Sequence, residues 1–422
     1  MDIREAALPL DATGISAFLH SLPTPPLLLG LGEARHFVEE LGELRNDIFR
    51  HLVEHEGYRS IALESDCLRG LLVDDHIATG DGTLDDVMEH GFSHRFGTSP
   101  ANRELVRWMR AYNRDHDDDH DARLRFFGFD GPLEYWAESP RRSLTALYSV
   151  LDGPDHCGGT PPHTPRNDPD HCGGTTPHTP RNDPLPCTRE TLDTLLGPDE
   201  RWSDEATATD PSTCIGRSPD AQRLRLITDD LVALLDTQLP RLSPDDAQRA
   251  ALHARTATGL LRYHHLMADT SPARWTRLSA QRDAMMAANL RAVAEHGPAL
   301  VFSSNLHLQR NRSVMAFGER QLEWWSAGAI TATRLGDRYA FLASALGTVG
   351  DDTPPPDTIE GILSALPWDN AIIDAHALGT AVAEPAPRAS HDFAYFPLDP
   401  AHLDLIDGIV FLKRAVRLAP LG

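Results

Sequence analysis

The sequence lacks several features that would place a protein in a secreted or membrane class. Its 422 residues include an odd number of cysteines without a CxxC pair, namely Cys67, Cys157, Cys172, Cys187 and Cys214. This pattern disfavours a disulfide framework and indicates a reducing compartment. No run approaches the roughly 18 apolar residues that a membrane-spanning helix needs. The N-terminal residues MDIREAALPL are acidic and carry no apolar stretch typical of a signal peptide. We therefore expect a cytoplasmic protein without a membrane partner.

Basic residues are also scarce. The chain has 39 Lys and Arg against 62 Asp and Glu, which gives a formal net charge of −23, and Lys413 is its one lysine. Such an acidic surface repels phosphate backbones and anionic lipids. We expect neither nucleic acid nor anionic membrane as a main partner. No feature of the sequence indicates an oligomeric state.

Several catalytic motifs are absent. There is no GxSxG elbow of a serine hydrolase, no HExxH zinc motif and no Walker A loop. The segment Gly30-Leu31-Gly32-Glu33-Ala34-Arg35 matches only the first half of a GxGxxG loop. Arg35 replaces the third glycine, and an acidic residue stands where pyrophosphate would bind, so a dinucleotide site is disfavoured.

Short apolar runs alternate with helical patterns along the chain. The runs predict buried strands at 27–31, 60–63, 125–129, 299–303, 339–342, 371–373 and 409–412. Apolar residues at spacings of three and four predict helices at about 38–52, 66–78, 103–114, 220–239, 245–268 and 275–295. This alternation predicts an α/β fold with a parallel-rich central sheet flanked by helices.

The middle of the chain has a different character. Residues 155–169 and 170–184 form a tandem repeat that differs only at Pro161 and Thr176. Its Pro, Gly and polar residues offer almost no apolar surface, which predicts a flexible surface segment. We expect a first core part at 1–139, a mostly helical cap insertion at 140–275 over an active-site cleft, and a second core part at 276–422.

Polar residues follow four of the predicted strands. Glu33 and His36 follow the first, Glu64 and Asp66 the second, Asp130 the third, and Asn305 and His307 the fourth. Ligand sites of open parallel sheets form at the carboxyl ends of the strands. We therefore expect these side chains to meet at one edge.

This set of residues suits general-base hydrolysis. His36 titrates near neutrality and can accept a proton from water, with Glu33 or Glu64 as its carboxylate partner. If a helix begins near Ala34, Glu33 and His36 share one side of its first turn. Arg45 would balance a carboxylate or bind a substrate oxygen, and His307 would act as a second acid or base.

Structural roles are open for the same residues. His36 could make only a structural hydrogen bond, the two glutamates could cap helices, Arg45 could be solvated, and Asp130 could be a turn residue. His264 and His265 fit ordinary helix positions, and His94 and His116 fit the surface. Zinc binding by Cys157 with His163, or by Cys172 with His178, matches no finger spacing.

The residues resemble the erythromycin esterase family. The resemblance begins in GLGEARHFVEELGELR, which includes Phe37, and in RHLVEHEGYRSIALES. It continues at Arg125 to Asp130, Gln281 to Met286, Asn305 to Gln309, Gly336 to Tyr339 and Asp407 to Ile409. The resemblance implies an α/β core with a helical portion over a cleft, and ester hydrolysis without a covalent serine intermediate.

The resemblance also implies roles for individual residues. His36 would activate water, and Glu33, Glu64 and Arg45 would belong to the same cleft. Where the family usually shows His-Asn-x-His, this sequence has Ser304-Asn305-Leu306-His307, so a serine replaces the first histidine. Serine is a poor metal ligand. We expect no required cofactor and no protein metal ligands, although members of the family differ in whether a divalent metal matters.

Three functions are compatible with these residues. The first is hydrolysis of a macrolide-like or other natural-product ester or lactone, in which His36, Glu33, Glu64, Arg45 and His307 act chemically and Ser304, Asn305 and Asp130 bind substrate. The second is a tailoring reaction of secondary metabolism that uses the same base for cyclisation, elimination or acyl transfer. The third is non-catalytic binding of a natural product. The sequence does not separate a role in antibiotic resistance from self-protection or biosynthesis.

Overall fold

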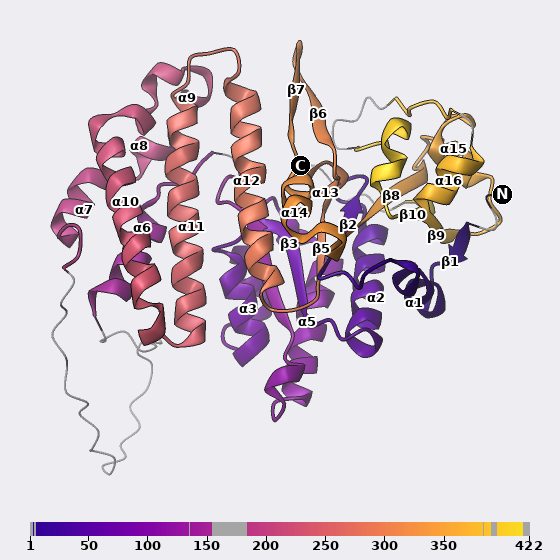
Figure 1. Ribbon diagram of the computed structural model, residues 1–422, viewed down its shortest axis with the longest axis horizontal. Helices are drawn as coiled ribbons and strands as arrows, with labels where there is room; N and C mark the ends of the chain where they lie inside the picture. The colour runs from indigo at the N-terminus through magenta and orange to yellow at the C-terminus, as the bar shows by residue number, and fades with distance from the viewer. Residues whose placement is uncertain are drawn as a thin grey trace. The chain divides into compact units, whose positions relative to one another are not determined.

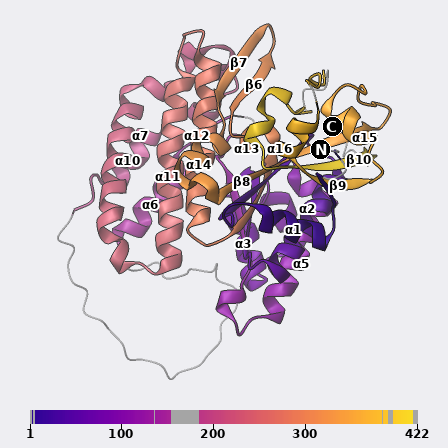
Figure 2. The ribbon, with the colours of Figure 1, turned by 45° about the vertical axis from the view of Figure 1, so that its right-hand side comes forward.

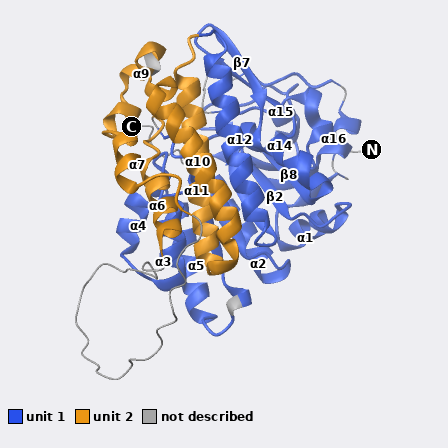
Figure 3. Ribbon diagram, turned by 60° about the vertical axis from the view of Figure 1, so that its left-hand side comes forward, with its two compact units in different colours: residues 1–135, 271–422 blue, residues 136–270 orange. Residues whose placement is uncertain are grey.

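The computed structural model describes residue 3 and residues 6–134, 136–153, 184–382, 384–389 and 395–416. The chain divides into two compact units, one formed by Met1–Tyr135 with Ser271–Gly422 and the other by Trp136–Thr270 (Figure 3). The predicted insertion, 140–275, differs from the second unit by four or five residues at each end. The predicted tandem repeat lies outside the described residues except for Pro184.

A mostly parallel sheet forms the first unit (Figure 1). Among the described residues it has eight strands in the order β1-β9-β10-β8-β2-β5-β3-β4. Their bounds are β1 (Ala7–Pro9), β2 (Leu28–Glu33), β3 (Ser60–Asp66), β4 (Arg125–Asp130), β5 (Ala299–Ser304), β8 (Tyr339–Val349), β9 (Asn370–Asp374) and β10 (Gly408–Ala415). Only the pairs β1–β9 and β9–β10 are antiparallel. The predicted parallel-rich α/β fold is confirmed, and all seven predicted strands are present.

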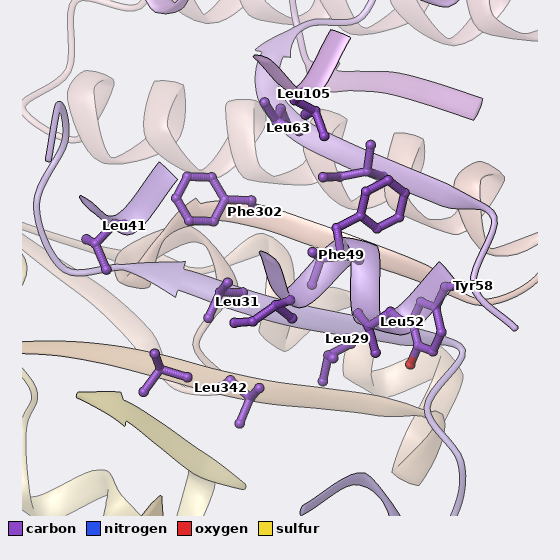
Figure 4. Close-up of a cluster of buried hydrophobic side chains, with 14 of the residues drawn as sticks. Leu29, Leu31, Leu41, Phe49, Leu52, Tyr58, Leu63, Leu105, Phe302 and Leu342 are labelled. Carbon is purple, nitrogen blue, oxygen red and sulfur yellow. The ribbon is translucent and has the colours of Figure 1, made fainter. Parts of the chain in front are cut away.

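Helices cover both faces of this sheet, because residues along the strands alternate between two apolar clusters. Leu29 and Leu31 join the cluster drawn in Figure 4, whereas Leu28 joins the cluster on the other face. The first face packs against α1 (Ala12–Ser21), α2 (Glu39–His55), α3 (Gly70–Thr79), α4 (Leu84–His90) and α5 (Pro100–Asp115). The second packs against α12 (Arg274–Ala294), α14 (Ala327–Leu335), α15 (Ile359–Ser364) and α16 (Ala375–Ala381). Burial on both faces explains why the strands read as continuous apolar runs.

One element of the first unit lies outside the main sheet. Strands β6 (Arg312–Phe317) and β7 (Arg320–Trp325) form an antiparallel hairpin that follows α13 (Asn305–Leu308) and leads into α14. Figure 2 shows the hairpin extending from the end of the sheet beside α12. Neither this hairpin nor β1 was predicted from the sequence.

The second unit is helical. It consists of α6 (Arg141–Asp152), α7 (Arg189–Leu196), α8 (Glu200–Ser203), α9 (Ala206–Thr209), α10 (Pro219–Gln238) and α11 (Pro244–Met267). Its core includes Trp202, Leu224 and Leu231. His264 is buried in α11, and its Nε2 lies 2.9 Å from the carbonyl oxygen of Glu138, a structural hydrogen bond at an ordinary helix position. No helix among the described residues has the length and apolar character needed to cross a membrane.

Candidate active site

The carboxyl ends of four neighbouring parallel strands bring the predicted residues to one edge of the sheet. Glu33 ends β2 and pairs in register with Ser304, which ends β5. Glu64 lies near the end of β3, and Asp130 ends β4. His307 follows β5 in α13. The topology therefore assembles side chains that are far apart in sequence.

His36 and Glu33 are directly paired. His36 Nδ1 lies 2.7 Å from Glu33 Oε2. The expectation of a helix near Ala34 is wrong, because α2 begins only at Glu39. Phe37 adopts a left-handed backbone conformation (φ 64°), so the chain turns between the strand and the helix. A tight loop, and not a helical turn, makes the contact.

The loop is fixed on both sides. The Ala34 N–H donates to Ser344 Oγ at 2.6 Å, and the Phe396 N–H donates to the Ala34 carbonyl at 2.6 Å. The rings of Phe37, Phe96 and Phe396 surround the His36 imidazole at centroid distances of 6.3, 5.9 and 5.1 Å. The His36 side chain remains 21% exposed. Three aromatic rings thus pack around the imidazole, which remains partly exposed to solvent.

The surroundings of His36 favour its protonated form. Burial lowers the pKa of His36 and is the largest single effect, but the charge and hydrogen bond of Glu33 and the charge of Glu64 together outweigh it. The net result is a pKa raised above the ordinary 6.5. The charges of Glu33 and Glu64 therefore stabilise the imidazolium form of His36.

Glu64 lies at the centre of the site. Its Oε2 accepts hydrogen bonds from Ser303 Oγ at 2.6 Å and from the Ser304 N–H at 3.0 Å. Its Oε1 lies 3.1 Å from Arg282 Nη2 and 3.5 Å from His307 Nε2. Burial raises the pKa of Glu64, but the charges of His307, His36 and Arg282 together with the Ser303 hydrogen bond lower it to about 2. Glu64 is therefore ionised at neutral pH.

His307 is the second imidazole with a carboxylate partner. Its Nδ1 lies 2.9 Å from Asp283 Oδ1, and Asp283 is fully buried in α12. Burial lowers the pKa of His307, but Asp283 and Glu64 raise it above 6.5 overall. His36 with Glu33 and His307 with Asp283 therefore form two imidazole–carboxylate pairs, and Glu64 acts electrostatically on both.

The sequence analysis did not predict that three further residues, Arg282, Asp283 and His94, contact the site. Arg282 donates to both oxygens of Asp130, with a shortest distance of 2.7 Å, and also to Glu64. Burial opposes each charge, but this pairing raises the pKa of Arg282 and holds that of Asp130 far below its usual range. The adjacent charges of Arg282 and Asp283 inside an otherwise alanine- and methionine-rich helix were the available signal.

The interpretation of His94 as a surface residue is wrong. Its Nε2 lies 3.1 Å from Asp130 Oδ2, and its side chain is only 21% exposed. His94 has a positive φ of 54°, as does Arg95 at 62°. The turn places an imidazole beside a carboxylate that lies 36 residues further along the chain. His116 is exposed and stacks on Tyr112, as a surface residue does.

Arg45 lies beside this cluster in a network of its own. Its guanidinium donates to Asn46 Oδ1 at 2.7 Å and to Asn102 Oδ1 at 2.8 Å, and it lies 5.0 Å from the centroid of the Phe302 ring. Burial lowers the pKa of Arg45 to about 10, against the charges of Glu33 and Glu39. Arg45 and Glu33 both line a cavity of about 30 Å³, which is room for one or two water molecules.

Asn305 is engaged with the backbone. Its Nδ2 donates to the carbonyls of Ser344 at 3.0 Å and Phe396 at 3.1 Å, and its Oδ1 accepts from the Ser344 N–H. A β-carbon at Gly32 would lie only 2.0 Å from this Oδ1. Asn305 thus holds β8 and the Phe396 segment at the site. Substrate contacts of Asn305, Ser304 and Asp130 stay a prediction.

Among the described residues, no group of three or more His, Cys, Asp or Glu side chains is arranged to hold a metal ion. The carboxylates at the strand ends surround the cation of Arg282 instead. The cysteine and histidine positions of the tandem repeat lie outside the described residues.

The fold and site define an α/β protein with three imidazole–carboxylate pairs at the carboxyl edge of a parallel sheet. A family model described as erythromycin esterase matches residues 53–415. The chain belongs to the erythromycin esterase family. The match begins after the loop of Glu33 and His36, so this loop is placed in the site by the structure and not by the family match.

Three solved structures share the fold. The first is a crystal structure of a Bacillus cereus protein, with a TM-score of 0.70 and 17% identity over 99% of this chain and 98% of the other. The second is a variant of the erythromycin esterase EreC in its open conformation, with a TM-score of 0.66 and 15% identity over 96% and 95% of the two chains. The third is a succinoglycan biosynthesis protein, with a TM-score of 0.60 and 15% identity over 99% and 96%. No curated protein sequence matches this chain significantly.

Proposed function

We propose that this protein hydrolyses a carboxylic ester or lactone of a macrolide-like or related natural product, through water activated by His36. Family membership and the likeness to a protein named as an erythromycin esterase support the ester chemistry. The observation that carries the proposal is the 2.7 Å contact between His36 Nδ1 and Glu33. This contact fixes the tautomer and leaves Nε2 free to accept a proton.

The two imidazoles take complementary parts in the proposed reaction. His36 Nε2 removes a proton from water while the water oxygen attacks the ester carbonyl, and Glu33 stabilises the imidazolium that forms. His307, held by Asp283, donates its Nε2 proton to the departing alkoxide. Ionised Glu64 stabilises positive charge on whichever imidazole carries the proton, because it acts on both.

The remaining predicted residues support this chemistry. Arg45 acts on Glu33 through its charge across the small cavity. Ser304 offers a hydroxyl at the end of β5 for a polar substrate group. Hydrogen bonds within the protein already occupy the side chains of Asn305 and Asp130. We therefore propose that these two residues position their neighbours at the site.

We propose further that no metal ion is required. A divalent cation placed between Glu64 and Asp130 would meet the guanidinium of Arg282, which already forms ion pairs with both carboxylates. Treatment with a chelator should leave turnover unchanged. Loss of turnover that a divalent ion restores would contradict this proposal.

The test is product analysis with a panel of macrolides, other lactones and simple esters. Mass spectrometry should show products heavier by one water molecule. His36→Ala should abolish their formation, whereas His116→Ala, which removes an exposed imidazole just after α5, should not. Turnover that survives His36→Ala in a folded protein would refute the assignment of the base.

A second function is favoured by one observation, the replacement of the usual family histidine by Ser304. A changed group beside Glu33 suits a tailoring reaction, such as ring closure, elimination or acyl transfer, that begins with the same base. The same mass spectra separate the candidates, because a product of unchanged or lower mass supports tailoring. Binding without any product would indicate a natural-product-binding protein.

A further inference from the structure

Asp283 is a junction between the site and the β6–β7 hairpin. Its Oδ1 lies 2.9 Å from His307 Nδ1 and accepts the N–H of Ala327 at 2.7 Å. Its Oδ2 accepts the indole Nε1–H of Trp324 at 2.6 Å. Asp283 is fully buried, and Trp324 is only 6% exposed. Three elements, α13, β7 and the start of α14, therefore meet on one carboxylate.

The hairpin and His307 are also joined along the chain. The chain runs from His307 into β6, and β7 returns to α14 directly beside Asp283. Ser313, which pairs with Trp324 across the hairpin, donates its hydroxyl to the Leu306 carbonyl. The foot of the hairpin is thus bonded both to the helix that carries His307 and to the carboxylate that holds His307.

We propose that Trp324 is a positioning residue for His307, acting through Asp283. A hydrogen-bond donor draws negative charge toward itself and fixes the carboxylate oxygen that it contacts. The indole N–H therefore sets both the direction of the Asp283–His307 bond and the charge that Asp283 offers to the imidazole. This inference goes beyond the proposed function, although its kinetic readout rests on it.

Removal of this donor has a definite sign. With one donor fewer, more of the negative charge of Asp283 acts on His307, so the imidazolium becomes more stable and the pKa of His307 rises further. The other charges that face His307 are Glu64 on β3, which raises its pKa, and Arg282 on α12, which lowers it. Neither contacts Trp324 through a hydrogen bond among the described residues.

The first test compares two neighbouring tryptophans in the full chain. Trp324→Phe keeps an aromatic ring and removes the donor, whereas Trp325→Phe changes a side chain that is 52% exposed on the opposite face of β7. His307 is followed by NMR in protein labelled with ¹⁵N-histidine, and its signal is identified by its loss in His307→Gln. Trp324→Phe should move the titration midpoint of His307 to higher pH, and Trp325→Phe should leave it in place. Equal midpoints in the two variants would overturn the proposal.

The second test needs no tryptophan variant and so holds even if Trp324→Phe does not fold. One of the seven indole N–H signals should shift with the midpoint of His307 and stop shifting in His307→Gln. If no indole signal follows His307, the proposal fails. Where ester turnover is found, Trp324→Phe should lower kcat roughly tenfold with KM unchanged. The NMR midpoints do not depend on turnover, so failure of the proposed function is distinguishable from failure of this inference.

Discussion

Glu33→Gln tests the assignment of the base most directly. The substitution keeps the shape of the side chain and removes the charge that lies 2.7 Å from His36 Nδ1. A hydrogen bond to a charged group is worth about 1.5–3 kcal/mol, and each 1.36 kcal/mol in the barrier is a factor of about ten in rate. We therefore expect kcat to fall roughly 10- to 100-fold, because the imidazolium formed during the reaction loses this stabilisation.

The same substitution has a second consequence in the pH profile. Glu33 is the largest of the effects that raise the pKa of His36. The base must be neutral, so kcat/KM of the parent enzyme should rise with pH through a pKa above 6.5. In Glu33→Gln the acidic limb should move to lower pH.

The assay is the pH dependence of ester hydrolysis, with the fold checked by circular dichroism. Glu54→Gln is a matched control, since Glu54 lies on α2 with a side chain that is 58% exposed. An acidic limb that does not move in Glu33→Gln, or an unchanged kcat, would refute the pairing of Glu33 with a catalytic His36.

Three further outcomes follow from the buried charges and the close backbone approach. Arg282→Met should lower the free energy of unfolding by about 3–5 kcal/mol, measured by urea denaturation, because it removes the guanidinium that pairs with two buried carboxylates. The pKa of Glu64 is lowered to about 2 from 4.5, so its contribution to the free energy of unfolding is present above pH 4.5 and is lost as the pH falls toward 2. Urea midpoints of Glu64→Gln should therefore depend less on pH in this window than those of the unmutated protein. An equal pH dependence would contradict this prediction. Gly32→Ala should destabilise the fold and impair turnover, since its β-carbon would lie 2.0 Å from Asn305 Oδ1. The control is Gly379→Ala on α16, where the added β-carbon has no neighbour closer than 3.8 Å. In thermal melts Gly379→Ala should be neutral or stabilising.

The strands and the edge that carries the site were predictable because each depends on local pattern. Buried strands read as apolar runs, and the carboxyl ends of parallel strands share one edge. The direction of β9 was not predictable, since the run Ala371 to Ile373 reads the same whether it pairs parallel or antiparallel. The β6–β7 hairpin was missed because Val314, Phe317 and Trp325 are exposed, so its apolar residues mark no core face.

The partners within the site were harder to predict than its members. Periodicity shows which face of α12 is buried, but it does not show that Arg282 meets Asp130, a residue 152 positions away. The Glu33–His36 contact was expected for a wrong reason, because the backbone turn at Phe37 leaves no mark in the periodicity. The role of His94 depends on a left-handed turn residue and a distant carboxylate, and neither is a pattern in the sequence.

The position of β5 has a consequence for the order in which the protein acquires its site during synthesis. β5 lies between β2 and β3 and forms hydrogen bonds with both. The ribosome makes β2, β3 and β4 long before residues 299–304. Strands β2 and β3 therefore lack β5, the strand that joins them, while the helical unit is being made. The pairing of Glu33 with the partner strand, and the arrival of Arg282 and His307, then occur in one late step. The nascent chain should therefore gain the strand between β2 and β3 and the charged partners of Glu64 together, and not one by one.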